Sequence, residues 1–181
     1  MTGSIANSRE DGHRQVHLAN AGLVLMNPFL PPFFDRLGLL SSGGGTLVAG
    51  LEAVSKAVHL LQYLADGRLD RPESDLVLNK LLCGLEPATP VEPSVKANAD
   101  DHAVCEQLLA TVIAHWAGLG TTSAAGLRES FLQREGMLRH EGDGWSLTVP
   151  RQTIDVLLDR IPWTFASVYH RWMRAPPHVR W

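Results

Sequence analysis

The sequence predicts a mainly helical α+β domain with a late β-hairpin and an extended, aromatic C-terminal tail. In several segments between residues 47 and 135, apolar residues recur at intervals of three and four, which is typical of amphipathic helices. Over residues 136–150 apolar and polar residues largely alternate instead, which favours strands. Both periods are lost after Pro162, and residues 163–181 carry three of the five tryptophans of the chain.

Length and composition narrow the class of protein. A chain of 181 residues fits one domain with a real core. The formal net charge is −3, and acidic and basic residues are interspersed, so we expect no nucleic-acid partner. No run of apolar residues predicts a signal peptide or a membrane span. Cys83 and Cys105 are too few for a disulfide framework, and we therefore expect a cytoplasmic protein.

The first part of the chain is predicted to consist of a disordered tail, a helical region broken by prolines, and a flexible connector. Residues 1–15 are polar and are expected to form a disordered N-terminal tail, so the domain is assigned to residues 16–181. The following apolar run contains Pro28, Pro31 and Pro32, which exclude one uninterrupted helix. We expect a short buried element, a break, and then a helix over about 32–37. The stretch "SSGGGT" reads as a flexible connector.

Three amphipathic helices are expected in the middle of the chain. The first covers about 47–65 and ends at Gly67, and the second runs from Ser74 or Asp75 to Gly84. The proline-rich segment "LEPATPVEPSVKANADD" then predicts a surface loop. The third helix follows it, with acidic residues at its positive end and one apolar side that runs to Trp116.

The last third of the domain changes from helix to strand. Thr122 or Ser123 is expected to cap a short helix over "AAGLRESFLQREG". The segment "GMLRHEGDGWSLTVP" predicts a β-hairpin with its turn near Gly142–Gly144. The next segment, "RQTIDVLLDRIP", is predicted to be a short helical or extended element that Pro162 stops.

The histidine, cysteine, serine and glycine residues of the chain do not form a recognisable catalytic, metal-binding or phosphate-binding motif. The pairs His13–His17 and His102–Cys105 have metal-ligand spacing, but each lacks a second pair, so we expect no metal and no cofactor. There is no G-x-S-x-G elbow and no phosphate-binding glycine loop. An enzyme or small-ligand module on a helical scaffold remains the alternative, and it would need His115, Glu129 and Arg128 to meet in a pocket.

The tail is the strongest functional signal. Tryptophan, methionine and arginine are enriched at protein interfaces, and the prolines of the tail exclude one amphipathic membrane helix. The tail is therefore expected either to fold back on the helices or to dock on another chain, and the sequence leaves both open. The residues expected to contact a partner are Trp163, Trp172, Met173 and Trp181, with Arg128, Phe131 and Arg134 as a second patch.

Six blocks of the sequence resemble the C-terminal region of the contractile injection system tape measure proteins of phage-tail-like particles. In chain order they are "NAGLVLMNPFLPPFFDRLGLL", "AVHLLQYLADG", "LVLNKLLCGL", "VIAHWAGLGTTSAAGLRESFLQREGMLR", "GWSLTVPRQTIDVLLDRIPW" and "VRW". They cover residues 16–181, and none of them is a catalytic motif.

The resemblance implies structural work rather than catalysis. Tape measure proteins lie in the lumen of the inner tube, set its length, and engage the spike and baseplate through their C-terminal region. It implies spike, tube and baseplate proteins as partners, a homotrimer in the assembly, and a place inside the mature particle. A helical ruler needs about 1.5 Å per residue. Some fifteen polar residues precede the match here, so we expect this chain by itself hardly to measure a tube. The alternatives are a C-terminal portion of a longer ruler, a short relative that works at the baseplate, and a chain whose measuring segment lies elsewhere; the sequence leaves all three open.

Overall fold

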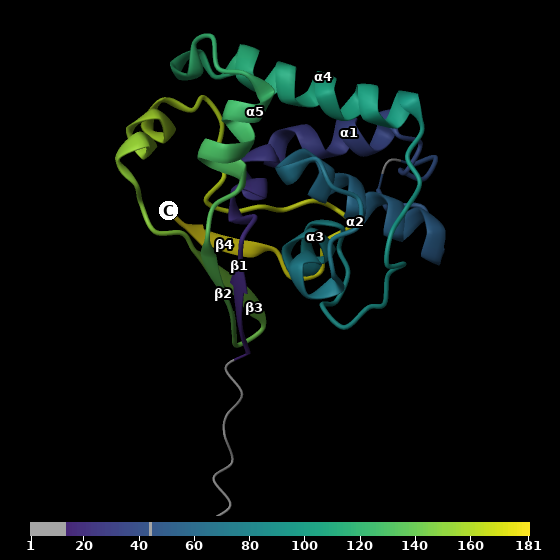
Figure 1. Cartoon of the computed structure of the whole chain (residues 1–181). Helices are drawn as coiled ribbons and strands as arrows, with labels where there is room; N and C mark the ends of the chain where they lie inside the picture. Colours follow the sequence, from purple (N-terminus) through teal and green to yellow (C-terminus); the bar gives the residue numbers. More distant parts are fainter. Residues whose placement is uncertain (1–13, 44) are drawn as a thin grey trace, which may run out of the picture.

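The computed structural model describes residues 14–43 and 45–181, in which helices lie above and beside a small β-sheet (Figure 1). The sheet of the described chain has the order β1-β2-β3-β4. Its strands are β1 (Gln15–Leu18), β2 (Gly136–Glu141), β3 (Gly144–Thr148) and β4 (Pro177–Arg180). The pairs β1–β2 and β2–β3 are antiparallel, whereas β4 is parallel to β3. The mixed α+β class is therefore confirmed.

The β-hairpin forms where the alternating pattern predicts it. Glu141 of β2 pairs with Gly144 of β3, which leaves Gly142 and Asp143 as the turn. Gly142 has a φ of 58°, a left-handed conformation that glycine adopts at little cost. The hairpin is joined on one side by β1, which begins at Gln15, inside the segment expected to be disordered. Residues 1–13 of that segment lie outside the described residues.

The proline-rich apolar run forms two helical pieces. The 3-10 helix η1 (Ala21–Phe29) precedes the α-helix α1 (Leu30–Arg36). The predicted break is therefore a change of helix type, and α1 begins at Leu30 rather than near residue 32. Pro31 and Pro32 fall in its first turn, where backbone N–H groups have no intrahelical acceptor, so prolines are tolerated there.

The middle helices lie where the periodicity predicts them, although the first of them begins at Leu51 rather than near residue 47. Helix α2 (Leu51–Asp66) ends at Gly67, which has a φ of 75°. The short helices η2 (Glu73–Leu76) and α3 (Val77–Leu82) are followed by Gly84 with a φ of 76°. Both glycines thus terminate helices in the left-handed conformation.

The longest helix, α4 (Ala99–His115), begins with reciprocal hydrogen bonds between Asn98 and Asp101. The 3-10 turn η3 (Ala117–Leu119) follows, and then α5 (Ala124–Leu127), which Ser123 caps through its hydroxyl. The chain next forms a π-helical turn, η4 (Arg128–Leu132), and after the hairpin the 3-10 helix η5 (Thr153–Arg160). Figure 1 shows α4 lying along the top of the molecule, above α1 and α2.

The C-terminal tail contributes a strand that the sequence pattern did not predict. Beyond η5 the chain passes beneath the helices and enters the sheet as β4 (Figure 1). The free edge of β4 is covered by the tail itself, because the Val179 N–H donates to the Ala166 carbonyl at 2.8 Å and Ser167 forms a bridge with His178. The described residues contain no helix that is both long and apolar enough to span a bilayer.

The core joins segments from both ends of the chain. Leu25 and Phe34 from the N-terminal helices are fully buried, as are Leu61 of α2, Val112 of α4 and Leu147 of β3. Strands at positions 15 and 177 share one sheet with the hairpin, so the sheet joins segments from both ends of the described chain.

Candidate partner-binding surface

The tail tryptophans hold the tail against the helices through their indole N–H groups. Trp163 donates to the Leu25 carbonyl at 2.9 Å, and its ring meets Phe29 edge to face with centroids 5.0 Å apart. Trp172 donates to the Leu82 carbonyl, also at 2.9 Å. A buried indole needs such a partner, so each bond fixes one point along the tail. Both rings remain partly exposed.

The segment around Trp172 is closely packed. Met173 is 6% exposed, and the ring of Trp172 meets that of Phe34 edge to face at 5.8 Å. On its other side the indole stacks on His170 at 4.7 Å. Burial lowers the pKa of His170 below its ordinary value, because a desolvated imidazolium is disfavoured. Met173 is therefore a core residue in this structure.

Replacing Gly84 with alanine is expected to displace this part of the tail. A Cβ at Gly84 would lie 2.1 Å from the Trp172 carbonyl oxygen, and the φ of 76° already disfavours a side chain. Gly67 is the matched control, because its φ is 75° and nothing lies within 4 Å of its Cβ position. We expect Gly67→Ala to cost about 1–2 kcal/mol. We expect Gly84→Ala to cost about 1–3 kcal/mol more from overpacking.

Urea unfolding of both variants, followed by tryptophan fluorescence, measures this difference. Equal losses of unfolding free energy would show that the Trp172 backbone does not press on Gly84.

The last residue of the chain meets a buried ion pair. Arg134 forms two hydrogen bonds with Asp155, at 2.6 and 2.8 Å, and the two side chains are 3% and 0% exposed. The Trp181 indole donates to the same carboxylate at 2.9 Å, and the Arg134 guanidinium lies over its ring at 5.2 Å from the centroid. The structure thus brings together Arg134 and Trp181, two residues that the sequence assigned to different patches.

The remaining residues of the second predicted patch also contact the interior of the molecule. Phe131 is 1% exposed and packs on Trp116 at 4.7 Å. Arg128 donates to the carbonyls of Tyr63 and Leu64, both at 3.1 Å, and so caps the last turn of α2. The same guanidinium pairs with Glu106 at 3.1 Å. Phe131 and Arg134 therefore lie in the core and do not form a surface patch with Arg128.

The side chains that an enzyme or small-ligand module would require do not meet in a pocket. His115 bonds through Nδ1 to the Thr111 carbonyl at 2.8 Å, and Arg128 is committed to α2. Within the described chain, neither makes a hydrogen bond or an ion pair with Glu129. Burial is also the main cause that raises the pKa of the Cys105 thiol to about 12, which makes it a poor nucleophile.

Metal binding has no visible site in the part of the chain that the structure describes. No group of three or more His, Cys, Asp or Glu residues there is placed so that it could hold a metal ion. His102 packs its ring on Tyr63 at 4.8 Å, and His13 lies outside the described residues.

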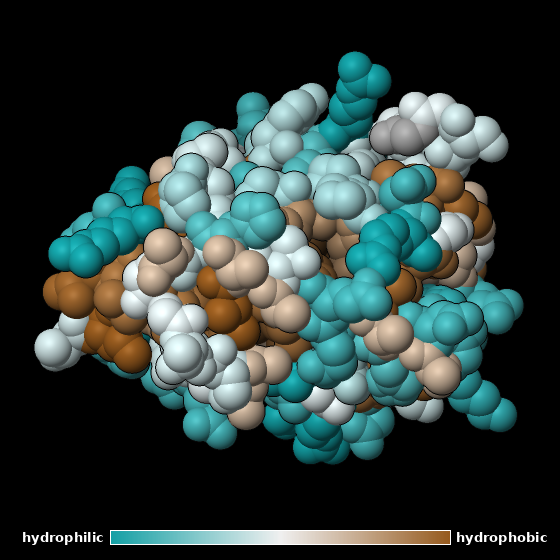
Figure 2. All heavy atoms as spheres, turned by 90° about the horizontal axis from the view of Figure 1, so that it is seen from above, coloured by the Kyte–Doolittle hydropathy of each residue, from teal (hydrophilic) through white to brown (hydrophobic). Residues whose placement is uncertain are grey.

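An exposed apolar surface lies on η5, where the sequence analysis selected no residue. Val156 is 62% exposed and Ile154 is 38% exposed, and they flank Asp155, which holds Trp181. We call Ile154, Val156 and Trp181 the η5 surface. Figure 2 shows apolar atoms gathered at the left edge of the molecule, the side on which η5 lies in Figure 1. The signal in the sequence was the apolar pair on either side of an aspartate in "TIDVLL".

The arrangement defines a class of protein. Its arginines, tryptophans and acidic groups hold segments of the described chain together, and apolar side chains on η5 face solvent, as expected of a structural protein that works through contacts. The chain belongs to the contractile injection system tape measure protein family, whose family model matches residues 3–181. The family resemblance of the sequence blocks is thereby confirmed. Neither the curated proteins nor the solved structures contain a match to the chain.

Proposed function

We propose that this chain is a non-catalytic assembly protein that engages the inner tube lumen and the spike and baseplate end of a contractile injection particle. The family match over residues 3–181 is the observation that carries the assembly role. The family is one of structural proteins, which agrees with charged and aromatic groups that are occupied in internal contacts. Assembly in the cytoplasm, incorporation into the mature particle and a homotrimeric state are parts of the same proposal.

The η5 surface is the contact that we propose for the partner. Val156 and Ile154 present apolar side chains to solvent, and exposed apolar groups next to a partly buried tryptophan match the composition of interface cores. Trp163 and Trp172 extend this contact along the tail through the exposed parts of their rings. Met173, Phe131 and Arg134 support it from the core, and Arg128 does so by holding α2.

Co-purification tests this proposal with single substitutions. Deletion of residues 172–181 would remove β4 and the Trp181 anchor, so it would confuse loss of fold with loss of binding. Val156→Glu places a charge on the exposed surface instead. Leu51→Glu is the matched control, since Leu51 is 51% exposed at the start of α2, where a carboxylate is favourable.

We expect tagged parent protein and Leu51→Glu to capture the spike, tube or baseplate proteins encoded beside this chain, and Val156→Glu to lose them while its unfolding free energy is unchanged. The mass of the captured complex gives the copy number. Capture of these components by Val156→Glu at the parent level would remove the η5 surface from the proposal. Failure of the folded parent to capture any of them would overturn the assembly role.

A further inference from the structure

The C-terminal tail makes a tight turn beside α3 before it enters the sheet as β4 (Figure 1). The Met173 N–H donates to the His170 carbonyl at 2.9 Å, which closes a β-turn. In and next to this turn the side chains of Tyr169, Arg171 and Arg174 are exposed, that of Tyr169 to 63%. We call these three residues the tail-turn surface.

The backbone of the turn is held in place by the residues between the exposed side chains. Val168 precedes the turn and is 0% exposed, and Met173 ends it and is 6% exposed. The Trp172 indole is hydrogen-bonded to the Leu82 carbonyl, and the Trp172 carbonyl lies close against Gly84. The turn is therefore ordered before any partner binds, and only the exposed side chains lose conformational freedom on docking.

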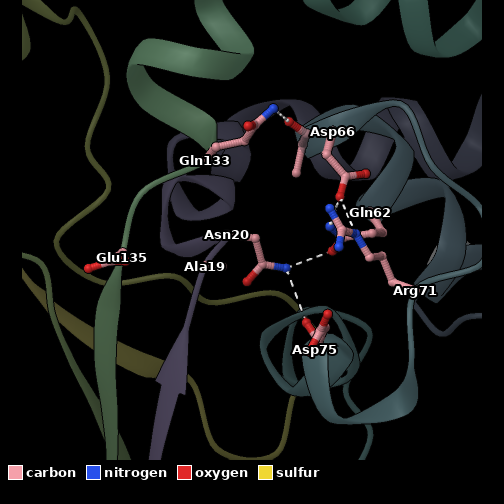
Figure 3. Close-up of a pocket in the computed structure, with 9 residues that line it drawn as sticks. Ala19, Asn20, Gln62, Asp66, Arg71, Asp75, Gln133 and Glu135 are labelled. Atoms are coloured by element: carbon pink, nitrogen blue, oxygen red, sulfur yellow. Dashed lines mark hydrogen bonds and ion pairs between the residues drawn. The ribbon is translucent and has the colours of Figure 1, made fainter.

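The two arginines of the tail-turn surface form no ion pair with any described residue. Residues 160–181 contain four arginines and no aspartate or glutamate. Glu86 lines the same small hollow as Arg174, but it makes no ion pair with it. Arginines in the helical part of the molecule are paired instead, and Figure 3 shows Arg71 directed at Asp66, which accepts from its Nε at 2.7 Å. The other arginines that form ion pairs in the described chain are Arg68, Arg128, Arg134 and Arg151.

The chemistry of the tail-turn surface favours a protein segment that carries carboxylates. A guanidinium can donate two parallel hydrogen bonds to one carboxylate, which makes arginine well suited to acidic partners. Arginine and tyrosine are also among the residues that contribute most to binding at protein interfaces, and an exposed tyrosine adds both apolar area and a hydroxyl. A nucleic acid is disfavoured, because the formal net charge of −3 repels a phosphate backbone.

We propose that the tail-turn surface docks an acidic segment of another protein. Arg171 and Arg174 donate hydrogen bonds to aspartate or glutamate side chains of that segment, and the ring of Tyr169 packs against it. The tail-turn surface shares no residue with the η5 surface. Loss of capture by Val156→Glu and loss of acidic-peptide binding by Arg171→Gln are therefore separate outcomes, and either proposal can fail while the other stands.

NMR titration of the folded full chain with a hexaglutamate peptide tests this contact, with a hexaglutamine peptide as the uncharged probe. The buffer contains about 0.15 M salt, in which long-range attraction between exposed charges is screened. With hexaglutamate we expect saturable shifts of the backbone amides of Tyr169, Arg171 and Arg174 and of the two arginine Nε–H groups. We expect no such shifts with hexaglutamine. A DNA oligonucleotide with six phosphates is the third probe, and it should bind more weakly than hexaglutamate.

The variant Arg171→Gln removes one charge from the tail-turn surface and should leave the free energy of unfolding unchanged. We expect it to weaken hexaglutamate binding about fivefold, because a charge-assisted contact is lost. Arg139→Gln is the matched control, since Arg139 is an exposed arginine of β2 and also forms no ion pair with the described residues, and it should bind as the parent does. Equal weakening by the two variants would reveal an effect of net charge alone and overturn the proposal. The absence of saturable shifts at millimolar hexaglutamate would also overturn it, as would tighter binding of the oligonucleotide.

Discussion

Asp155→Asn is expected to lower the free energy of unfolding by about 3–5 kcal/mol, because it leaves the buried guanidinium of Arg134 without its counter-ion. The carboxylate also accepts from the backbone N–H of Gln152 at 2.8 Å and from the Trp181 indole at 2.9 Å. One substitution therefore weakens the contacts of the segment between η4 and β2, of η5 and of the chain end together. Urea unfolding of the folded variant measures the loss.

The matched control is Asp159→Asn. Asp159 pairs with Arg151 at 3.1 Å, but these side chains are 64% and 49% exposed. Solvent screens such a pair, so we expect a change of at most about 1 kcal/mol. Losses of similar size in the two variants would mean that the Arg134–Asp155 pair is not desolvated. The double variant Arg134→Met with Asp155→Leu should recover part of the stability lost in Asp155→Asn, because no unpaired charge remains.

The contribution of Asp155 to the free energy of unfolding should fall as the pH is lowered. Burial by itself raises the pKa of Asp155, but hydrogen bonds from Arg134, Gln152 and Trp181 outweigh it and hold the pKa below the ordinary value of 3.8. The unfolded chain therefore binds the proton more readily as the pH falls. The stability that Asp155 contributes is complete above about pH 5 and declines as the pH falls through its folded pKa. The difference between the parent and Asp155→Asn should shrink over the same range.

Gly22→Ala is expected to cost about 4 kcal/mol or more, or to prevent folding. A Cβ there would lie 1.7 Å from the Phe131 carbonyl oxygen and 2.6 Å from the Leu132 Cα, both of which are backbone atoms. Backbone atoms cannot turn aside as a side chain does, so η1 and η4 would have to separate. Circular dichroism and urea unfolding measure the result.

Gly43→Ala provides the control for Gly22→Ala. Nothing lies within 4 Å of the Cβ position at Gly43, which is exposed and has no positive φ. We expect its unfolding free energy to stay within about 0.5 kcal/mol of the parent. If Gly22→Ala unfolds at the same urea concentration as Gly43→Ala, then η1 and η4 do not pack as closely as described.

Local patterns predicted the elements whose signals lie within a few residues. The helix ends at Gly67 and Gly84, the Ser123 cap and the Gly142 turn all depend on backbone conformations that neighbouring residues impose. The start of α1 was displaced by two residues, since prolines are compatible with a first turn as well as with a break.

For the candidate site, the structure shows how the selected residues pack, and their contact with a partner stays a prediction. Trp163, Trp172 and Trp181 were selected for their composition, and the alternatives of folding back and docking stayed open. The structure places their N–H groups on internal acceptors, while the partner contact remains a prediction. Phe131 and Arg134 looked like a surface patch because charged residues surround them in the sequence, and burial of an arginine depends on a partner that lies 21 residues away.

The sequence by itself determined the α+β class, most helix ends, the hairpin and the family, because periodicity, capping and motif order are properties of neighbouring residues. The tertiary structure decided that Gln15–Leu18 and Pro177–Arg180 become strands, since an edge strand is stabilised by hydrogen bonds to a distant partner. It also decided which charges are buried and that Ile154 and Val156 face solvent. Each of these depends on contacts between residues far apart in the chain.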